Sequence, residues 1–274
     1  MSRELKRVLK GALTGEVIIP PLRTILTNPK FDGFEVPIPE FKPRPPDGWF
    51  HPSTHPLWPE RMLYYYLTEP DKLMDSELDT DGAMATTQGT FWHAFMQHVM
   101  LMHDLVLIMN PRGKYPHDKV EYPVSDPELG SRGSMDGVLN PDTLNIDIPI
   151  GLEIKTMFSA KLNRCPKGTP DSPQKLAWLK EKCPEYYAQA QEYLRMSEYT
   201  QQRFLFVGLE YPYPMVEIAV PFSYGDAYQV ADKYRNVRQA VADGIAPDPC
   251  CGIRSVQAKQ CVARSVCPIG RASL

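Results

Sequence analysis

The sequence predicts an α/β fold of the mixed α+β kind, in which helices flank a central mixed β-sheet. Two observations predict it. Segments with the apolar spacing of helices alternate with short runs of strand character. The first strands follow one another closely and later strands come after a long helical segment. This order favours an antiparallel meander that is extended by a further strand after a crossover helix.

Four segments predict helices. The segment that begins at Gly89 is typical, because its large apolar residues recur at helical spacing. Pro184 should break the third segment, and Gly244 is a suitable cap for the fourth. The polar stretch from Asp71 to Thr80 should be a loop. The expected helices are Glu60–Leu67, Gly89–Met109, Pro173–Glu198 and Tyr224–Asp243.

Five segments predict strands. Each is short and rich in β-branched or other apolar residues, and turn-forming residues flank it. A Pro-Asp turn near Asn140 to Thr143 should join the second and third strands. The expected strands are Val120–Val124, Gly133–Leu139, Ile146–Met157, Phe204–Leu209 and Val216–Val220.

The chain of 274 residues divides into three regions of different composition. Residues 1–60 form a proline-rich N-terminal arm, residues 61–245 form the core, and residues 246–274 form a cysteine-rich C-terminal tail. Proline is dense between Pro20 and Pro59, which predicts an extended arm rather than a packed helix. The hydrophobic share of 43% and the charged share of 23% are ordinary for a globular protein.

Charge and hydropathy exclude two classes of protein. The net charge of −3 and the pI of about 6.1 argue against a passive nucleic-acid coat, because such proteins are usually basic. An enzyme that grips DNA through a local patch and a bound divalent metal remains compatible with that charge. No apolar run approaches the roughly 20 residues of a membrane helix, and the charged N-terminus lacks a secretion signal. We therefore expect a cytoplasmic protein with no membrane partner.

The run Gly151-Leu152-Glu153-Ile154-Lys155 carries the first chemical motif. Alternate side chains of a strand share a face, so Glu153 and Lys155 should point the same way, while Leu152 and Ile154 enter the core. An acid beside a lysine can hold a divalent metal and place a positive charge near a nucleophilic water. The alternative interpretation is a surface ion pair.

Asp136, in the run Gly133-Ser134-Met135-Asp136, ends the preceding predicted strand. Hairpin pairing would bring its carboxylate beside Glu153, and two carboxylates suit Mg²⁺ or Mn²⁺. A turn aspartate is the alternative interpretation. His93, four residues after Gly89 on the first long helix, would add an imidazole ligand suited to Mn²⁺, and the alternative is a histidine without a ligand role.

Gln189 and Tyr193 lie four residues apart on the helix that follows the lysine strand, so they share a helix face. The alternative interpretation is an ordinary helix surface with a buried tyrosine. The ordered series G-x-x-x-H, GxxD, ExK and QxxxY resembles the RecB-like branch of the PD-(D/E)xK nucleases, which includes phage-encoded and CRISPR-associated RecB-like exonucleases. The resemblance extends by motif from Gly89 to Tyr193.

The resemblance implies a restriction-endonuclease-like core and a site for each motif residue. His93, Asp136, Glu153 and the main-chain carbonyl of Ile154 would bind Mg²⁺ or Mn²⁺. Lys155 would position or activate the attacking water, while Gln189 and Tyr193 would orient Lys155 or contact the DNA backbone. Glu121 would be a further acidic residue of lower rank. Lys161, Arg164 and Lys167 follow the catalytic strand and could hold phosphates; the alternative is a solvated basic loop.

Four of the six cysteines lie in the tail, at Cys250, Cys251, Cys261 and Cys267. Disulfides are improbable in a cytosolic protein, so this clustering indicates a metal site or buried thiols. Many RecB-like nucleases hold an iron–sulfur cluster with one early cysteine and three near the C-terminus, but here the early cysteine is absent. Three alternatives stay open: a [4Fe–4S] cluster on the tail cysteines, a replacement ligand from Cys165 or Cys183, or Zn²⁺ on four thiolates.

The resemblance implies a metal-dependent deoxyribonuclease with DNA as its partner, most simply an exonuclease in recombination, replication or repair. The size would suit a phage-encoded enzyme, which would act in the host cytoplasm, and no phosphate-loop motif of a helicase motor is present. A recombination or replication protein and a second copy of the chain are further candidate partners. The alternatives are a structure-specific flap or branch endonuclease, a CRISPR-adaptation end trimmer, and a non-catalytic DNA-binding or scaffold subunit.

Overall fold

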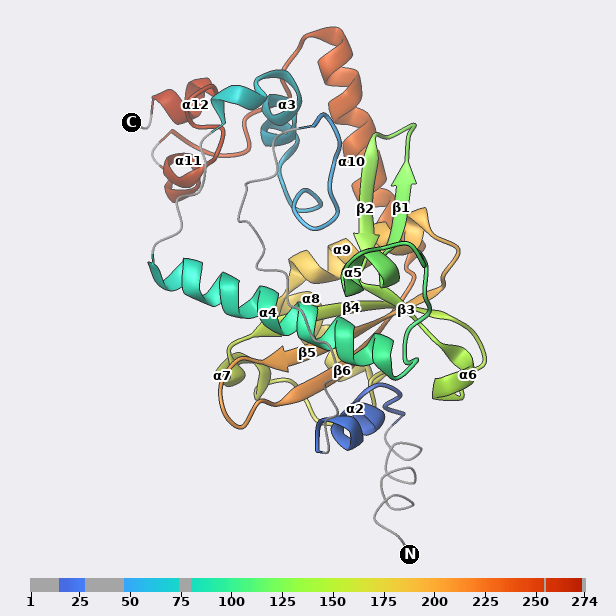
Figure 1. Cartoon of the computed structure of the whole chain (residues 1–274). Helices are drawn as coiled ribbons and strands as arrows, with labels where there is room; N and C mark the ends of the chain where they lie inside the picture. Colours follow the sequence, from blue (N-terminus) through green and yellow to red (C-terminus); the bar gives the residue numbers. More distant parts are fainter. Residues whose placement is uncertain (1–14, 28–46, 74–79, 254, 273–274) are drawn as a thin grey trace, which may run out of the picture.

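A four-stranded mixed sheet forms the centre of the protein, which we describe from a computed structural model (Figure 1). The structure describes residues 15–27, 47–73, 80–253 and 255–272. The outer pairs of strands are antiparallel and the central pair is parallel, as expected for a strand added after a crossover. In spatial order the strands are β3 (Gly137–Leu139), β4 (Ile150–Met157), β5 (Gln201–Gly208) and β6 (Met215–Pro221).

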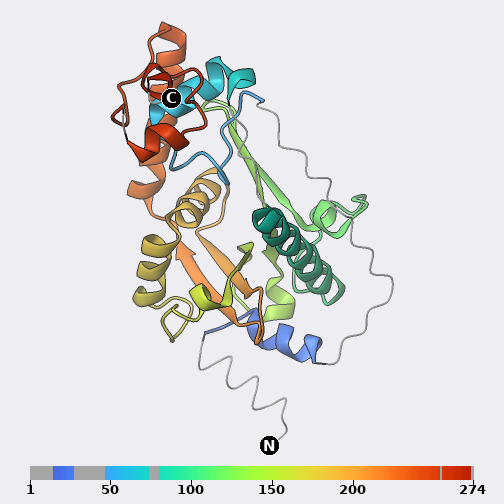
Figure 2. The same ribbon diagram turned by 90° about the vertical axis from the view of Figure 1, so that its left-hand side faces the viewer.

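Helices cover both faces of this sheet, so the fold is the expected mixed α/β arrangement (Figure 2). One face, with Leu152 and Ile154, packs against α4 (Thr80–Met102). The other face, with Phe204 and Phe206, packs against α8 (Pro173–Lys182) and α9 (Pro184–Met196). The break between α8 and α9 falls at Cys183, directly before Pro184, as the sequence predicts.

The expected three-stranded meander is wrong, because the segment Gly133–Leu139 is divided between two sheets. β1 (Tyr122–Asp126) and β2 (Ser131–Met135) pair as a separate antiparallel hairpin. After Asp136 the chain continues as β3, which pairs with β4. Pairing with two different partners requires a change of direction at Asp136, and that change places its side chain beside β4. Two short helices, α5 (Pro116–Val120) and α6 (Pro141–Leu144), precede β1 and β4.

Several boundaries differ from the expected ones. The first long helix starts at Thr80 and ends at Met102, where a turn with positive φ at Asp104 follows. The first strand begins at Tyr122, because Pro116 starts α5 with a favourable fixed φ. The remaining helices agree closely with the prediction: α3 (Glu60–Thr68) and α10 (Tyr224–Asp243), which Gly244 caps in the left-handed conformation. Part of the expected polar loop is a single turn, η1 (Pro70–Lys72), and residues 74–79 lie outside the described part.

The prediction of an extended proline-rich arm is wrong for Ile19–Leu26, which forms the helix α2. Its prolines occupy the first helical positions, where the missing N–H costs nothing. Ile18, Ile19 and Leu22 are fully buried against the sheet, and the carboxylate of Glu217 on β6 accepts the N–H of Ile18 at 3.0 Å. The other prolines from Pro29 to Pro46 lie outside the described residues.

The C-terminal tail forms two short helices, α11 (Val256–Gln260) and α12 (Pro268–Arg271), next to α3. Figure 1 shows these elements and α10 together at one end of the molecule, toward which the β1–β2 hairpin also extends. A short helix, α7 (Ser159–Leu162), follows β4 in the chain. Within the described ranges, no helix has both the length and the apolar character needed to cross a membrane.

Candidate active site and cysteine cavity

Asp136 lies at the break between β2 and β3, where the two sheets diverge. One carboxylate oxygen, Oδ2, accepts the main-chain N–H of Ile154 at 2.6 Å. Gln97, one helical turn after His93 on α4, donates its amide to the main-chain carbonyl of Asp136 at 2.9 Å. The backbone and the side chain of Asp136 are therefore both held in place next to β4, and the side chain is buried.

Glu153 and Lys155 share a face of β4, as the alternation of the strand predicts. Lys155 Nζ lies 2.7 Å from Glu153 Oε1, and it also lies 5.1 Å from the centre of the Tyr186 ring. Glu153 is only 2% exposed, so this is a buried pair and the alternative of a surface ion pair is wrong. The lysine side chain is 20% exposed and borders a groove described below.

Two glutamines from different elements bind the carboxylate of Glu153. Gln189 on α9 donates to Oε1 at 2.8 Å and to the hydroxyl oxygen of Tyr193 at 3.2 Å. Gln202 on β5 lies 3.4 Å from Oε2. The structure thus brings Gln189 and Tyr193 to the predicted site, with Gln189 in contact with Glu153 and the ring of Tyr186 against Lys155.

His93 on α4 lies 3.2 Å from the carboxylate of Asp136, from Nε2 to Oδ1. Gly89 explains how the helix comes so near, because a Cβ at this position would lie 2.8 Å from Thr156 Oγ1 on β4. Gly133 has a similar role in the hairpin, since its Cβ would lie 2.9 Å from the ring of Tyr193. Both glycines of the sequence motifs therefore permit close approach of one element to another.

The charges of this cluster perturb one another strongly. Burial and the neighbouring Asp136 carboxylate raise the pKa of Glu153 to about 7, although Lys155 opposes this shift. Burial also acts on Asp136, but His93 and Lys155 outweigh it and hold the pKa of Asp136 below its usual value. Burial would lower the pKa of His93 and Lys155, yet the two carboxylates raise both. Two neighbouring buried carboxylates are thus compensated by a lysine and a histidine.

The donor set of this cluster fits a hard divalent cation. Two buried carboxylates that repel each other are the ligands Mg²⁺ and Mn²⁺ prefer, and the buried Nε2 of His93 has an ion-pair partner but no hydrogen bond of good geometry. In the side-chain positions of the described chain, no three Asp, Glu, His or Cys residues already converge as a metal site. Lys155 Nζ forms an ion pair with Oε1 of Glu153, so this ion pair would have to change before Oε1 could bind a cation.

A groove of about 480 Å³ opens beside Lys155. Residues from α4, β4 and α7 line it, among them His93, Lys161 and Phe158. Of the three basic residues that could hold phosphates, Lys161 lines this groove, and Arg164 and Lys167, which the structure also describes, lie outside its lining.

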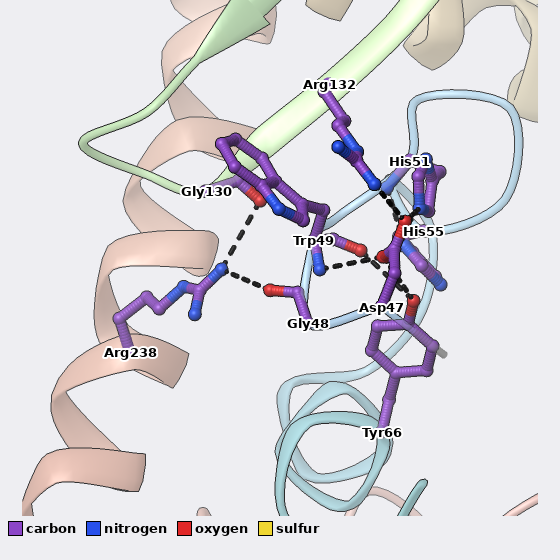
Figure 3. A network of polar contacts seen from close by, with 9 residues as sticks. All are labelled: Asp47, Gly48, Trp49, His51, His55, Tyr66, Gly130, Arg132 and Arg238. Carbon is purple, nitrogen blue, oxygen red and sulfur yellow. Dashed lines mark hydrogen bonds and ion pairs between the residues drawn. The ribbon is translucent and has the colours of Figure 1, made fainter. Parts of the chain in front are cut away.

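A second cavity, of about 690 Å³, lies on the Tyr193 side of the cluster and includes Glu121 in its lining. A network of polar contacts around Asp47, which no sequence motif indicated, forms one corner of this cavity (Figure 3). Asp47 accepts the main-chain N–H of Trp49 at 3.0 Å, pairs with His51 at 3.0 Å and binds Arg132 at 2.7 Å. The Arg132 guanidinium lies 5.0 Å from the Trp49 ring. Burial opposes ionisation, but Arg132 and the other donors hold the pKa of Asp47 well below its usual range.

The four tail cysteines line one small, mainly apolar cavity. Cys261 Sγ lies 3.7 Å from Met62 Sδ on α3, and Arg61 lines the same cavity as Cys267. Burial raises the pKa of Cys250 and Cys261, and neighbouring tail cysteines add to both shifts. The replacement-ligand alternative is wrong, because Cys165 and Cys183 pack in the core beneath α8 and are not in this cavity. Four thiols around one cavity are ligands of the type that a thiolate-bound metal centre uses, although in the described positions no three of them converge as a metal site.

The sequence motifs identified the centre of the site but not its support. Gln97 follows His93 by one helical turn, a spacing that could have identified it. Gln202 and the Asp47–Arg132 pair carry no such local signal, because the partners Glu153 and Arg132 are far away in the sequence.

Comparisons with known proteins give little beyond this geometry. No family model matches the sequence, and no curated protein matches it. The crystal structure of SSO0001 aligns with this chain at 13% sequence identity and a TM-score of 0.44, over 93% of this chain and 95% of that chain.

Proposed function

We propose that the chain is a metal-dependent DNA nuclease of the RecB-like branch of the PD-(D/E)xK superfamily, with a restriction-endonuclease-like core. One observation carries the proposal. Six side chains that the sequence motifs select meet in a single cluster of hydrogen bonds and ion pairs, and they come from α4, the β2–β3 junction, β4 and α9: His93, Asp136, Glu153, Lys155, Gln189 and Tyr193.

The residues would divide the chemistry between them. His93, Asp136 and Glu153, with the carbonyl of Ile154, would hold Mg²⁺ or Mn²⁺. A bound ion would polarise the scissile phosphate and lower the pKa of a bound water. Lys155 borders the groove and would align the attacking water and stabilise the charge that develops on the phosphate. Gln189 fixes the orientation of Glu153, and Tyr193 in turn fixes Gln189.

We infer that an exonuclease role in recombination, replication or repair is the simplest version of this function. A flap or branch endonuclease and an end trimmer would use the same cluster. The buried, mutually compensated charges favour an enzyme over a non-catalytic binding or scaffold subunit, because such charges cost stability that a purely structural role has no reason to retain. The four-thiol cavity supports a [4Fe–4S] cluster, with Zn²⁺ as the alternative.

The test is cleavage of end-labelled linear DNA with Mg²⁺, Mn²⁺ or chelator, with Lys155→Ala as the variant. We expect degradation by the wild type only with metal, and a loss of at least about 100-fold in the variant, as for removal of a charge-stabilising group. Lys182→Ala, an exposed lysine on α8 paired with Glu181, is the matched control. Equal inertness of wild type and variant on linear, flap and nicked DNA would overturn the proposal.

A further inference from the structure

Exposed aromatic rings lie in the lining of the groove beside Lys155 and in the β5–β6 loop, whose residue Leu209 also lines that groove. Phe158 lines the groove and is 60% exposed, and Tyr211 in the β5–β6 loop is 86% exposed. Tyr213 links this loop to α4, because its ring centre lies 5.7 Å from that of Trp92 and 6.5 Å from that of Tyr211. Exposed apolar side chains that group at one place mark a binding surface.

Hydrogen bonds hold the two aromatic segments together. Ser159, next to Phe158, donates its main-chain N–H to the Glu210 carboxylate at 2.6 Å and its hydroxyl to the Glu210 carbonyl at 2.8 Å. Gln88 on α4 donates to the carbonyl of Leu209 at 3.1 Å. The rings therefore stand on backbone that is fixed to both sides of the groove.

The groove itself carries positive charge. Lys155 and Lys161 line it together with the imidazole of His93. None of its lining residues, within the described part of the chain, is acidic. A cationic groove with exposed rings at its rim is the combination that binds single-stranded nucleic acid, with phosphates on the cations and bases on the rings.

We propose that this groove binds single-stranded DNA, with bases stacked on Phe158 and Tyr211 and the backbone held by Lys161. Stacking on a side chain requires an open base face, which a single strand offers along its length and a duplex covers with neighbouring base pairs. The inference rests on the proposed nuclease function and adds the strand class of its substrate and the residues that select it.

The experiment measures fluorescence anisotropy of a labelled DNA oligonucleotide, single-stranded or annealed to its complement, with chelator present to prevent cleavage. We expect the wild type to bind the single strand more tightly. Phe158→Ala and Tyr211→Ala should each weaken single-strand binding roughly tenfold, the usual effect of losing one stacking side chain, with little effect on the duplex. Phe158→Trp should retain the binding and Phe158→Leu should not.

Tyr224→Ala is the matched control, because Tyr224 is 67% exposed and stacks on Tyr228 at 4.1 Å on α10, yet is not among the residues that line the groove. It should bind like the wild type. Wild-type affinity of Phe158→Ala and Tyr211→Ala, or tighter binding of the duplex, would overturn the inference. Tighter binding of an RNA strand of the same sequence would overturn the assignment to DNA.

The cleavage assay separates this inference from the proposed function. Suppose that cleavage of single strands requires metal and Lys155 but is unchanged in Phe158→Ala. This result would support the nuclease function and reject the stacking surface. Single-strand binding that depends on the rings, without cleavage of any substrate, would support the surface and reject the nuclease.

Discussion

At the scale of the residue, the surroundings of Glu153 disfavour the ionised form of its carboxylate. It is 2% exposed, it lies near the ionised Asp136, and Lys155 compensates only part of the cost of its charge. The pKa of about 7 means that the folded protein takes up a proton there at a pH where the unfolded chain, with a usual value of 4.5, has lost it. A group of this kind stabilises the fold least when it is charged.

The sign of the pH dependence follows directly. The contribution of Glu153 to stability is fully present below pH 4.5 and is lost as the pH rises through about 7. We expect Glu153→Gln to lack this loss and to be more stable than the metal-free wild type by about 1–3 kcal/mol at pH 8, with little difference at pH 4.5. Urea unfolding with chelator at both pH values measures this. A pH-independent difference between the two proteins would contradict the prediction.

Gln189 acts on the same carboxylate through geometry rather than charge. We expect Gln189→Leu to reduce kcat for DNA cleavage by about 10- to 100-fold and to raise the metal concentration that gives half-maximal rate, because a supporting residue fixes the orientation of a ligand. KM for DNA should change little. Gln239→Leu, an exposed glutamine on α10, is the control. A variant with unchanged metal dependence would show that Gln189 does not position Glu153.

Two pairs of site residues could be predicted from the sequence because their spacing forces them onto one face, whereas His93 and Asp136 were expected from the order of the motifs along the chain. Glu153 and Lys155 are two apart on a strand, and Gln189 and Tyr193 are four apart on a helix, so each pair is forced onto one face. Asp47 and Arg132 are brought together only by the tertiary fold, and nothing near either residue indicates the other.

At the scale of the element, the separate β1–β2 hairpin depends on its attachment to α9. Arg195 on α9 makes that attachment, because it binds Asp126 at the end of β1 and also pairs with Glu192 at 3.0 Å. Burial raises the pKa of Glu192, and Arg195 only partly offsets this. Glu192 is fully buried, so removal of its partner would leave an uncompensated charge inside the protein.

We therefore expect Arg195→Met to lower the free energy of unfolding by about 3 kcal/mol. Arg235→Met, which removes an exposed pair with Asp232 on α10, should cost less than about 1 kcal/mol. Chemical denaturation at neutral pH provides both values. The double variant Arg195→Met/Glu192→Gln should recover part of the loss; if it does not, the cost comes from lost packing rather than from an unpaired buried charge.

Elements were predicted well where one periodicity ran without interruption, as in α3, α9 and α10. Two errors have clear physical causes. The prolines of α2 were interpreted as helix breakers, although at the first helical positions they favour a helix. The strand Gly133–Leu139 has continuous β character, and the division at Asp136 follows from pairing with two different partners, which strand propensity does not express.

At the scale of the whole molecule, the tail and α3 enclose the cysteine cavity, so a centre held there would join the C-terminus to the N-terminal half of the chain. We expect anaerobically purified wild type to contain either iron and sulfide in the ratio of a [4Fe–4S] cluster or zinc. Cys261→Ser and Cys267→Ser should lose this content, because four thiolates are needed.

Metal analysis and visible absorbance measure the outcome, and Cys183→Ser is the control, since Cys183 is buried beneath α8. Loss of metal in Cys183→Ser, or its absence from the wild type, would contradict this assignment. Metal removal from the wild type should also lower the Tm, because a ligand that binds only the folded state stabilises it.

The carboxylate of Glu217 receives the amides of Val17 and Ile18 from 200 and 199 residues earlier in the chain. Arg61 and the carbonyl of Pro247 are separated by 186 residues, and Arg238 and the carbonyl of Gly48 by 190. These earlier segments thus find their partners only after β6, α10 and the residues that follow α10 have been synthesised. Closing such long loops slows folding. During synthesis, the apolar side chains of α2 cannot be fully buried until β6 has been made, and in that interval aggregation competes with folding.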